Sequence, residues 1–356
     1  MTEPEMTMMH HGLGPAGIHA ISLALLYNTT ITNLNLRDNG IGEEGGQILA
    51  KLLRENYYIT ELDISENQLG SKSVFELAET LRESTNLVQL GLSGNNLCDK
   101  DAKILCSGLL SNSTLTSLDL SNNRFSSTAC ESFCKLLDEN FTLVYLNLSW
   151  NHILANGAQL LAKGLTGNMK LKSLNLAWNG IANGGAQAIS RALLENIVLA
   201  VIDLSSNRID SSGNNALAQV LETNSSIEEM RLAKNLIRNN GACALVKAIL
   251  KNPDSRLQKL DITGVNTEND FRLLAEEVKG IRPELIMVTN TTPERKVKPE
   301  TPDPGTLIRS YIAKQHVRVV DLFRSLDKDQ SMQVEYFASY LFHAHSFQDE
   351  TINTID

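Results

Sequence analysis

An asparagine that recurs every 28 residues constrains this chain more than any other feature. Each copy closes the same frame, in which aliphatic residues precede the asparagine by eight, five and three positions, as Leu115, Leu118 and Leu120 precede Asn123. Eight copies of this frame at one period indicate an array in which each repeat is one supersecondary unit. The recurring residues are Asn39, Asn67, Asn95, Asn123, Asn151, Asn179, Asn207 and Asn235.

Two periodicities follow each other within a repeat. Leu34 and Leu36 alternate with polar residues, which predicts a short strand with one buried face. Gly45, Leu49 and Leu53 then recur every fourth position, as on an amphipathic helix. One strand and one helix cannot bury their apolar faces alone, so neighbouring repeats must stack. We therefore predict an α/β solenoid of about ten 28-residue strand–helix repeats with a parallel inner sheet.

A second asparagine column follows the predicted helices. Asn56, Asn140, Asn168 and Asn196 belong to it, and Ser84 replaces the asparagine in one repeat. Asparagine tolerates the left-handed conformation that ends many helices. We accordingly predict a left-handed cap at these positions.

Both ends of the array depart from the consensus. Upstream, Met6 to His11 fits the frame with methionine in place of leucine and His11 in place of asparagine, which indicates a weak first repeat or the remnant of a longer array. Downstream, the frame slips by two residues at Pro253–Asp254, Leu260 restores a strand, and residues 285–287 offer the last one. The predicted domains are a repeat domain over 1–290, a proline-rich charged linker over 291–305 and a small helical tail over 306–356.

The overall charge excludes one class of partner. A formal net charge of −9 argues against nucleic acid or an anionic membrane held by bulk electrostatics. No apolar stretch approaches the roughly 18 residues of a membrane helix, and the first residues lack a signal-peptide pattern. We expect a cytoplasmic location, with the nucleus as the alternative.

Catalytic and metal-binding motifs are missing from the sequence. None of the five cysteines has Cys-x-x-Cys spacing: Cys106, Cys130 and Cys134 fall in small-residue packing columns without histidine neighbours, and Cys98 and Cys243 are single cysteines. There is no glycine-rich phosphate loop, nucleophile elbow or His-Glu-x-x-His motif. We expect no enzymatic activity and no cofactor.

The residues between the strand leucines point away from the core and form the inner wall. Trp150 and Trp178 hold the same position in adjacent repeats, and strands about 4.8 Å apart would let their rings stack. Tyr145 lies on the same strand as Trp150, with acids on the N-terminal side of this cluster and bases on the C-terminal side. Aromatic residues flanked by charge are typical of binding hot spots. The candidate protein-binding residues are Tyr145, Trp150, Trp178, Asp119, Asn147, Asn175, Asp203, Arg231 and Lys234.

A structural interpretation of the same residues stays open. A tryptophan before the asparagine can simply cover the strand end, and aspartate or asparagine in mid-strand is common in such repeats. On that interpretation most of these acids are only solvated.

The tail contains a degenerate calcium-loop motif. Asp327, Asp329 and Ser331 fall at loop positions 1, 3 and 5, and Glu335 follows at position 9. Position 6, which needs glycine, is Met332, and position 12, which needs a bidentate glutamate, is Ala338. We expect this motif to be a decayed EF-hand without strong calcium binding.

The repeat frame over residues 6–290 resembles the leucine-rich repeat, specifically its 28-residue ribonuclease-inhibitor-like class. The segments around Trp150 and Trp178 and the EF-hand-like tail are similar to the leucine-rich repeat-containing protein 74 family. The resemblance implies a horseshoe with strands inside and helices outside. It also implies that each ladder asparagine bonds backbone groups of the adjacent turns, a purely structural role.

The functional expectation is a non-enzymatic scaffold that binds a protein partner on the concave face. One alternative is a calcium-responsive adaptor that uses the degenerate EF-hand. Another is a GTPase-activating protein of the Ran type, since the ribonuclease-inhibitor-like class includes such activators. Those proteins end in a long acidic run, and this chain has none.

Overall fold

The computed structural model describes residues 4–289. Residues Met1–Asn290 form one compact unit. The predicted linker over 291–305, the helical tail over 306–356 and the calcium-loop residues within it lie outside the described part of the chain.

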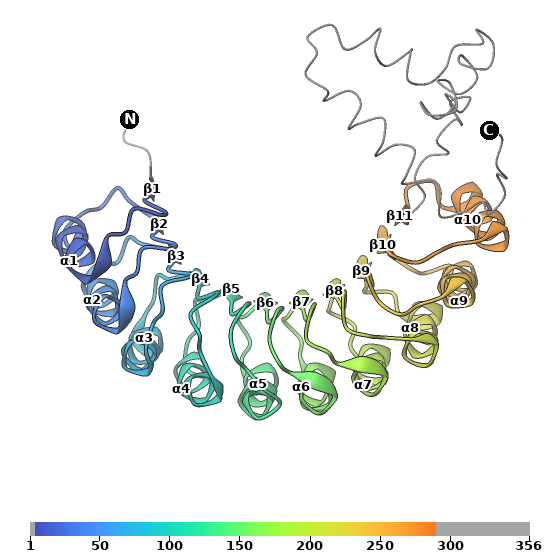
Figure 1. Cartoon of the computed structure of the whole chain (residues 1–356), viewed down its shortest axis with the longest axis horizontal. Coiled ribbons are helices and arrows are strands. Elements are labelled where there is room, and N and C mark those ends of the chain that lie inside the picture. The colour runs from blue at the N-terminus through green and yellow to red at the C-terminus, as the bar shows by residue number, and fades with distance from the viewer. Residues whose placement is uncertain (1–3, 290–356) are drawn as a thin grey trace, which may run out of the picture. The chain divides into compact units, whose positions relative to one another are not determined.

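Short parallel strands, hydrogen-bonded in sequence order, form one open sheet of eleven strands over the described residues. Figure 1 shows them lining the inner side of the curved array, with one helix on the outer side after each strand from β1 to β10. This arrangement confirms the predicted strand–helix solenoid. The strands are β1 (Glu5–Thr7), β2 (Asn33–Asn35), β3 (Glu61–Asp63), β4 (Gln89–Gly91), β5 (Ser117–Asp119), β6 (Tyr145–Asn147), β7 (Ser173–Asn175), β8 (Val201–Asp203), β9 (Glu229–Arg231), β10 (Lys259–Asp261) and β11 (Ile286–Val288).

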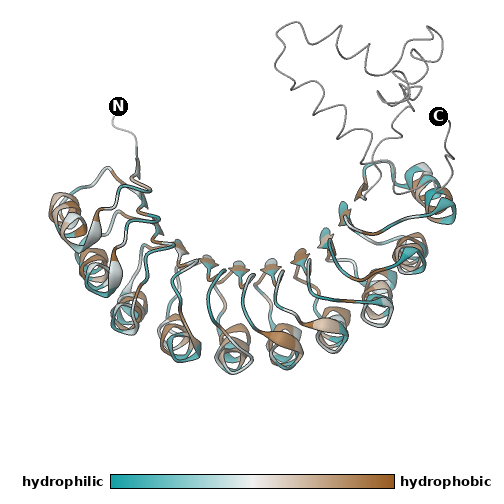
Figure 2. Cartoon of the chain, in the orientation of Figure 1, coloured by the Kyte–Doolittle hydropathy of each residue, from teal (hydrophilic) through white to brown (hydrophobic). Residues whose placement is uncertain are grey.

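Each helix carries both hydrophobic and hydrophilic residues along its length (Figure 2). The helices are α1 (Gly14–Leu25), α2 (Gly42–Glu55), α3 (Ser71–Glu83), α4 (Asp99–Leu109), α5 (Ala129–Glu139), α6 (Leu154–Gly167), α7 (Ala182–Glu195), α8 (Ser211–Thr223), α9 (Asn239–Lys251) and α10 (Asn269–Ile281). None of the helices between residues 4 and 289 is both long and apolar enough to span a bilayer.

The strand register follows the sequence period. Leu118 of β5 pairs with Leu146 of β6, 28 positions later, and both side chains are fully buried. At the N-terminal end Met6 pairs with Leu34, which confirms a first repeat there. At the other end Lys259 pairs with Glu229 and not with the residue 28 positions before it, as the slip at Pro253–Asp254 predicts.

The ladder asparagines connect each turn to its neighbours. The Oδ1 atom of Asn123 accepts hydrogen bonds from the backbone N–H groups of Asn95 and Leu97, both at 3.0 Å. Its Nδ2 atom donates to the carbonyl oxygens of Leu92 at 3.1 Å and Leu120 at 3.0 Å. All eight ladder side chains are buried. Because buried backbone groups need partners, this column closes the turns between successive repeats.

The second asparagine column does not form the predicted left-handed cap. Asn56, with φ −96° and ψ 116°, is extended, and Asn140 and Asn196 are extended as well. The side chain makes the cap instead: Asn56 Nδ2 donates to the carbonyl of Leu25, at the end of the preceding helix, at 2.7 Å. Its Oδ1 atom accepts from the N–H of Ile59 at 3.0 Å. The prediction was wrong because an inter-repeat bond satisfies the last carbonyls without a turn of positive φ.

Candidate functional site

The position just before each ladder asparagine has a left-handed backbone. Its φ is +55° at Trp150 and +58° at Trp178. Aspartate, asparagine and glycine tolerate this conformation, whereas a bulky side chain there is an outlier. The repeat turn imposes this positive φ, since the equivalent residue of the other repeats has it as well. These residues are His10, Asp38, Glu66, Gly94, Asn122, Ser206 and Lys234. Local backbone preference therefore does not account for the two tryptophans.

The indole rings of Trp150 and Trp178 stack. Their centroids lie 4.2 Å apart with an interplanar angle of 14°, as the repeat spacing predicts. Both remain open to solvent, with exposed fractions of 53% and 44%. The pair therefore presents a rigid aromatic surface beyond the carboxyl ends of β6 and β7.

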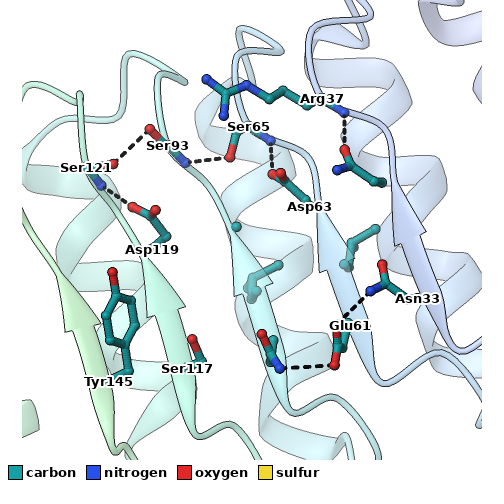
Figure 3. A pocket seen from close by; sticks show the side chains of 15 residues that line it. Asn33, Arg37, Glu61, Asp63, Ser65, Ser93, Ser117, Asp119, Ser121 and Tyr145 are labelled. Atoms are coloured by element: carbon teal, nitrogen blue, oxygen red, sulfur yellow. Dashed lines mark hydrogen bonds between the residues drawn. The ribbon is translucent and has the colours of Figure 1, made fainter. Parts of the chain in front are cut away.

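Tyr145 lies apart from this pair. It begins β6, at the opposite end of the strand from Trp150, and lines a polar hollow of about 460 Å³ on the concave wall (Figure 3). Its ring makes no aromatic contact with either tryptophan among residues 4–289. Burial raises the pKa of the Tyr145 hydroxyl, and the nearby Asp119 carboxylate raises it further. The aromatic cluster expected from the sequence is thus two separate features.

The polar hollow is lined by the inner faces of β2 to β6. Glu61 accepts hydrogen bonds from Asn33 Nδ2 at 2.7 Å and from Gln89 Nε2 at 3.0 Å (Figure 3). Gly91 keeps the hollow open, because a Cβ atom there would lie 2.6 Å from the Asp63 Oδ1 atom. No described residue forms an ion pair with Glu61, Asp63 or Asp119. These three carboxylates therefore have no ion-pair partner in the described range, whereas Arg37, which also lines the hollow, pairs with Glu66.

Four of the candidate binding residues have a structural hydrogen bond. In each, a side-chain oxygen accepts the backbone N–H of the residue two positions later, as in an Asx turn. This bond orients the chain where it leaves the strand, and it accounts for the asparagine or aspartate at most strand ends. Asn147 is only 8% exposed. The four bonds are Asp119 with Ser121 at 2.8 Å, Asn147 with Ser149 at 3.1 Å, Asn175 with Ala177 at 3.0 Å and Asp203 with Ser205 at 2.9 Å.

The expected cationic side of the wall is largely neutralised. Arg231 donates to both carboxylate oxygens of Glu229, at 2.8 and 3.0 Å, and lies 3.6 Å from Asp203. Lys259 contacts the same glutamate at 2.6 Å. The hydrogen bonds from Arg231 are the largest cause of a lowered Glu229 pKa. Acids and bases on adjacent strands pair with each other here, so Arg231 does not offer a free positive charge to a partner.

A second hollow lies beside Trp178, and the sequence analysis did not identify it. It has a volume of about 390 Å³ and is formed by the loops that follow β6, β7, β8 and β9. Trp178, Leu154 and Leu236 supply its apolar surface, and Arg208 and Lys234 lie at the same site. The signal in the sequence was a leucine at the first residue of α6 and at one loop position, whose equivalents are glycine, alanine, cysteine or polar residues. We call this hollow the Trp178 pocket.

The cysteines of the described region are reduced and suited to packing. Burial raises the pKa of the Cys106 thiol, and it raises the pKa of Cys130 to about 12. A thiol that stays protonated is a poor nucleophile and metal ligand. Within residues 4–289, no cluster of three or more histidine, cysteine, aspartate or glutamate side chains is arranged to hold a metal ion.

Comparison with known proteins supports the leucine-rich repeat and does not test the ribonuclease-inhibitor-like class. The family model described as "Leucine Rich repeat" matches residues 27–50, 55–78, 111–134, 139–162 and 167–190. A search of curated proteins found no match. These matches do not single out the leucine-rich repeat-containing protein 74 family.

Solved structures with a similar chain trace include the actin-binding site 2 of leiomodin-1. It is 20% identical over 42% of this chain and 86% of its own, with a TM-score of 0.36. Another is the crystal structure of the Rad7 and Elc1 complex in yeast, which is 17% identical over 78% of this chain and 71% of that one, with a TM-score of 0.47.

Proposed function

Since this chain is a leucine-rich-repeat protein, we propose that it is a non-enzymatic scaffold that binds a protein partner along the inner wall and strand-end edge of its solenoid. Repeat folds of this kind carry many unrelated specificities, so the proposal rests on the site and not on the fold. The observation that carries it is the exposed stack of Trp150 on Trp178.

The stack is difficult to explain as a stabilising device. Holding a side chain with a Cβ in the left-handed region costs roughly 1–2 kcal/mol per residue, whereas an aromatic pair contributes about 0.5–1.5 kcal/mol beyond its buried area. The contribution of the aromatic pairing alone is thus smaller than the backbone cost of two such residues. Large exposed indole surfaces are, however, what binding hot spots use. A role in recognition accounts for residues that the turn itself disfavours.

The acidic hollow supports the same proposal. Its carboxylates at Glu61, Asp63 and Asp119 lie on the inner wall beside Tyr145, and complementary charge across an interface steers association and fixes register. A partner with a basic segment would meet this wall while another part contacts the tryptophans. No observation on residues 4–289 favours the calcium-responsive adaptor or the GTPase activator over a scaffold.

A paired affinity purification tests this proposal. The baits are the wild-type chain, the double variant Trp150→Ala with Trp178→Ala, and a control with Phe141→Ala and Ile197→Ala. The control residues are also large, exposed and apolar, but they lie just before β6 and β8 and not after the strands. Circular dichroism verifies that all three baits are folded.

We expect proteins recovered by the wild type and the control to be lost from the tryptophan variant. A reconstituted complex of the purified partner would then lose at least about tenfold in affinity on the same substitutions. Recovery of the same proteins by all three baits would contradict the proposal and assign the tryptophans to structure alone.

A further inference from the structure

The Trp178 pocket combines side chains that the sheet register places side by side. Trp178, Ser206 and Lys234 hold one column position in three successive repeats, and Gly180, Arg208 and Leu236 hold the position two residues later. Leu154 and Leu236 are 54% and 61% exposed. Gly180, with φ +65°, leaves room beside them, because a Cβ atom there would lie 3.3 Å from Leu154 Cδ2. The result is an open apolar depression bounded by an indole and two leucines.

The charges at this pocket are unpaired, in contrast to those on the neighbouring strands. Arg208 and Lys234 are exposed, and neither forms an ion pair with a residue in the described range. Arg231 and Lys259, on the neighbouring strands, both pair with Glu229, and Arg231 also pairs with Asp203. Two free cations beside exposed apolar side chains favour a ligand that is both apolar and negatively charged.

One polar side chain that lines the pocket has no hydrogen-bond partner in the described part of the chain. The Ser206 hydroxyl, in the column between Trp178 and Lys234, is shielded from solvent and has no hydrogen-bond partner among residues 4–289. Shielded polar atoms normally have a partner. Because protein atoms cover this oxygen, it would bond a ligand only after its neighbours move.

We propose that the Trp178 pocket binds a short acidic peptide segment of the partner that carries one large aliphatic side chain. The aliphatic side chain lies against Trp178, Leu154 and Leu236, and the flanking carboxylates pair with Arg208 and Lys234. A volume of about 390 Å³ accommodates one such side chain with its backbone. This inference rests on the proposed function, because it names the chemistry of the partner at one end of the same surface.

Nucleic acid fits the pocket less well. A phosphate backbone is held by a row of cations, whereas this site offers two, beside an inner wall whose acids would repel it. The exposed leucines would also have no role against a phosphate.

Fluorescence anisotropy on the full chain tests the inference with defined probes. The probe is an acetylated, dye-labelled peptide of sequence Glu-Glu-Leu-Glu-Glu. One control peptide has alanine in place of leucine, and the other has lysine in place of every glutamate. We expect the leucine–glutamate peptide to bind at least about tenfold more tightly than either control, with an affinity that falls as salt rises. Equal affinity for the three peptides would overturn the inference.

Variants of the chain locate the binding. Arg208→Glu combined with Lys234→Glu reverses both charges, and Leu236→Ser removes one apolar side of the pocket. Lys163→Glu combined with Arg191→Glu, two exposed cations of α6 and α7 on the outer side, is the matched charge control. We expect the first two to weaken binding of the leucine–glutamate peptide by about tenfold or more, and the control to leave it unchanged. Binding that is insensitive to the charge reversal would place the peptide elsewhere and overturn the inference.

Two outcomes separate this inference from the proposed function. If a partner is lost with the tryptophan variant but kept by Arg208→Glu with Lys234→Glu, the proposed function stands and the acidic-peptide inference is wrong. Sedimentation of the free chain tests the alternative occupant, which is a second copy of this chain. If the chain binds no peptide but forms a dimer that the charge reversal dissociates, the ligand is the second copy and the acidic-peptide inference is wrong.

Discussion

The Oδ1 atom of Asn123 accepts the backbone N–H of Asn95, 28 positions earlier in the chain, at 3.0 Å. Asn95 accepts the N–H of Asn67 in the same way at 2.9 Å. One side chain thus satisfies groups in its own turn and in the preceding one. Because each repeat contacts only its neighbours, such bonds make the folding of one repeat depend on the next.

Replacing Asn123 with alanine tests this dependence. The change leaves the N–H groups of Asn95 and Leu97 and the carbonyl of Leu92 without their partner. A buried group left unsatisfied costs about 1–3 kcal/mol, so we expect a loss of roughly 3 kcal/mol or more in the free energy of unfolding, measured with urea. Asn215→Ala, on the exposed face of α8, is the control and should change it by less than about 0.5 kcal/mol. Similar values for the two variants would contradict the structural role of the ladder.

Gly164 of α6 lies against the backbone of α5. An added Cβ atom would lie 2.5 Å from the carbonyl oxygen of Cys134 and 3.0 Å from Leu137 Cβ. Gly164→Ala should therefore destabilise the chain by about 1–3 kcal/mol, although alanine is the better helix former. Gly184→Ala in α7 is the matched control, because its nearest neighbour, Ala155 Cβ, lies at 3.7 Å. We expect the control to be neutral or to stabilise by about 0.5–1 kcal/mol in the same thermal or urea unfolding measurement.

A double-mutant cycle measures the tryptophan stack itself. Trp150→Ala, Trp178→Ala and the double variant should show a coupling of about 0.5–1.5 kcal/mol in the free energy of unfolding. The left-handed backbone cost stays in the double variant, because alanine also has a Cβ atom, so the loss of stability reports the ring contacts and the apolar area that the indoles bury. A double variant that no longer folds would show that the pair is needed for the fold, and would weaken the argument for recognition.

The ion pair of Glu229 with Arg231 predicts a dependence of stability on pH. Hydrogen bonds from Arg231, and then Lys259, lower the Glu229 pKa below its ordinary 4.5. Its stabilisation is therefore fully present above about pH 4.5 and is lost as the pH falls through the lower pKa of the folded state.

Glu229→Gln should thus be less stable than the wild type at pH 7, and the difference should shrink below pH 4.5. Urea unfolding of both proteins across this range measures it. Arg231→Gln removes the main hydrogen-bond donor to Glu229 and should reduce the change in the free energy of unfolding over the same pH range. A difference between Glu229→Gln and wild type that stays constant with pH would exclude this pair as its source.

The sequence pattern did not predict which hydrogen bonds the second asparagine column and the Asx turns make. The asparagine at position 56 predicts a helix end, and α2 does end at Glu55. The residue type does not distinguish a left-handed backbone from a side chain that bonds the carbonyl of Leu25 in the previous repeat. Likewise the sequence predicts Asp119 as a solvated carboxylate on the concave face, although one of its oxygens accepts a hydrogen bond from the N–H of Ser121. Both distinctions depend on bond geometry that residue type alone does not specify.

The repeat period was sufficient to predict the fold, the order of the strands and the stacking of Trp150 on Trp178. The reason is that each repeat contacts only its neighbours, so one local pattern, copied every 28 residues, specifies the core and the register together. Tertiary structure alone decided which surface residues act together. It separated Tyr145 from the tryptophans and neutralised Arg231 with Glu229. It also brought Leu154, Arg208 and Leu236 to one pocket, because side chains from successive loops meet only when the curvature and rotamers of the folded array bring them together.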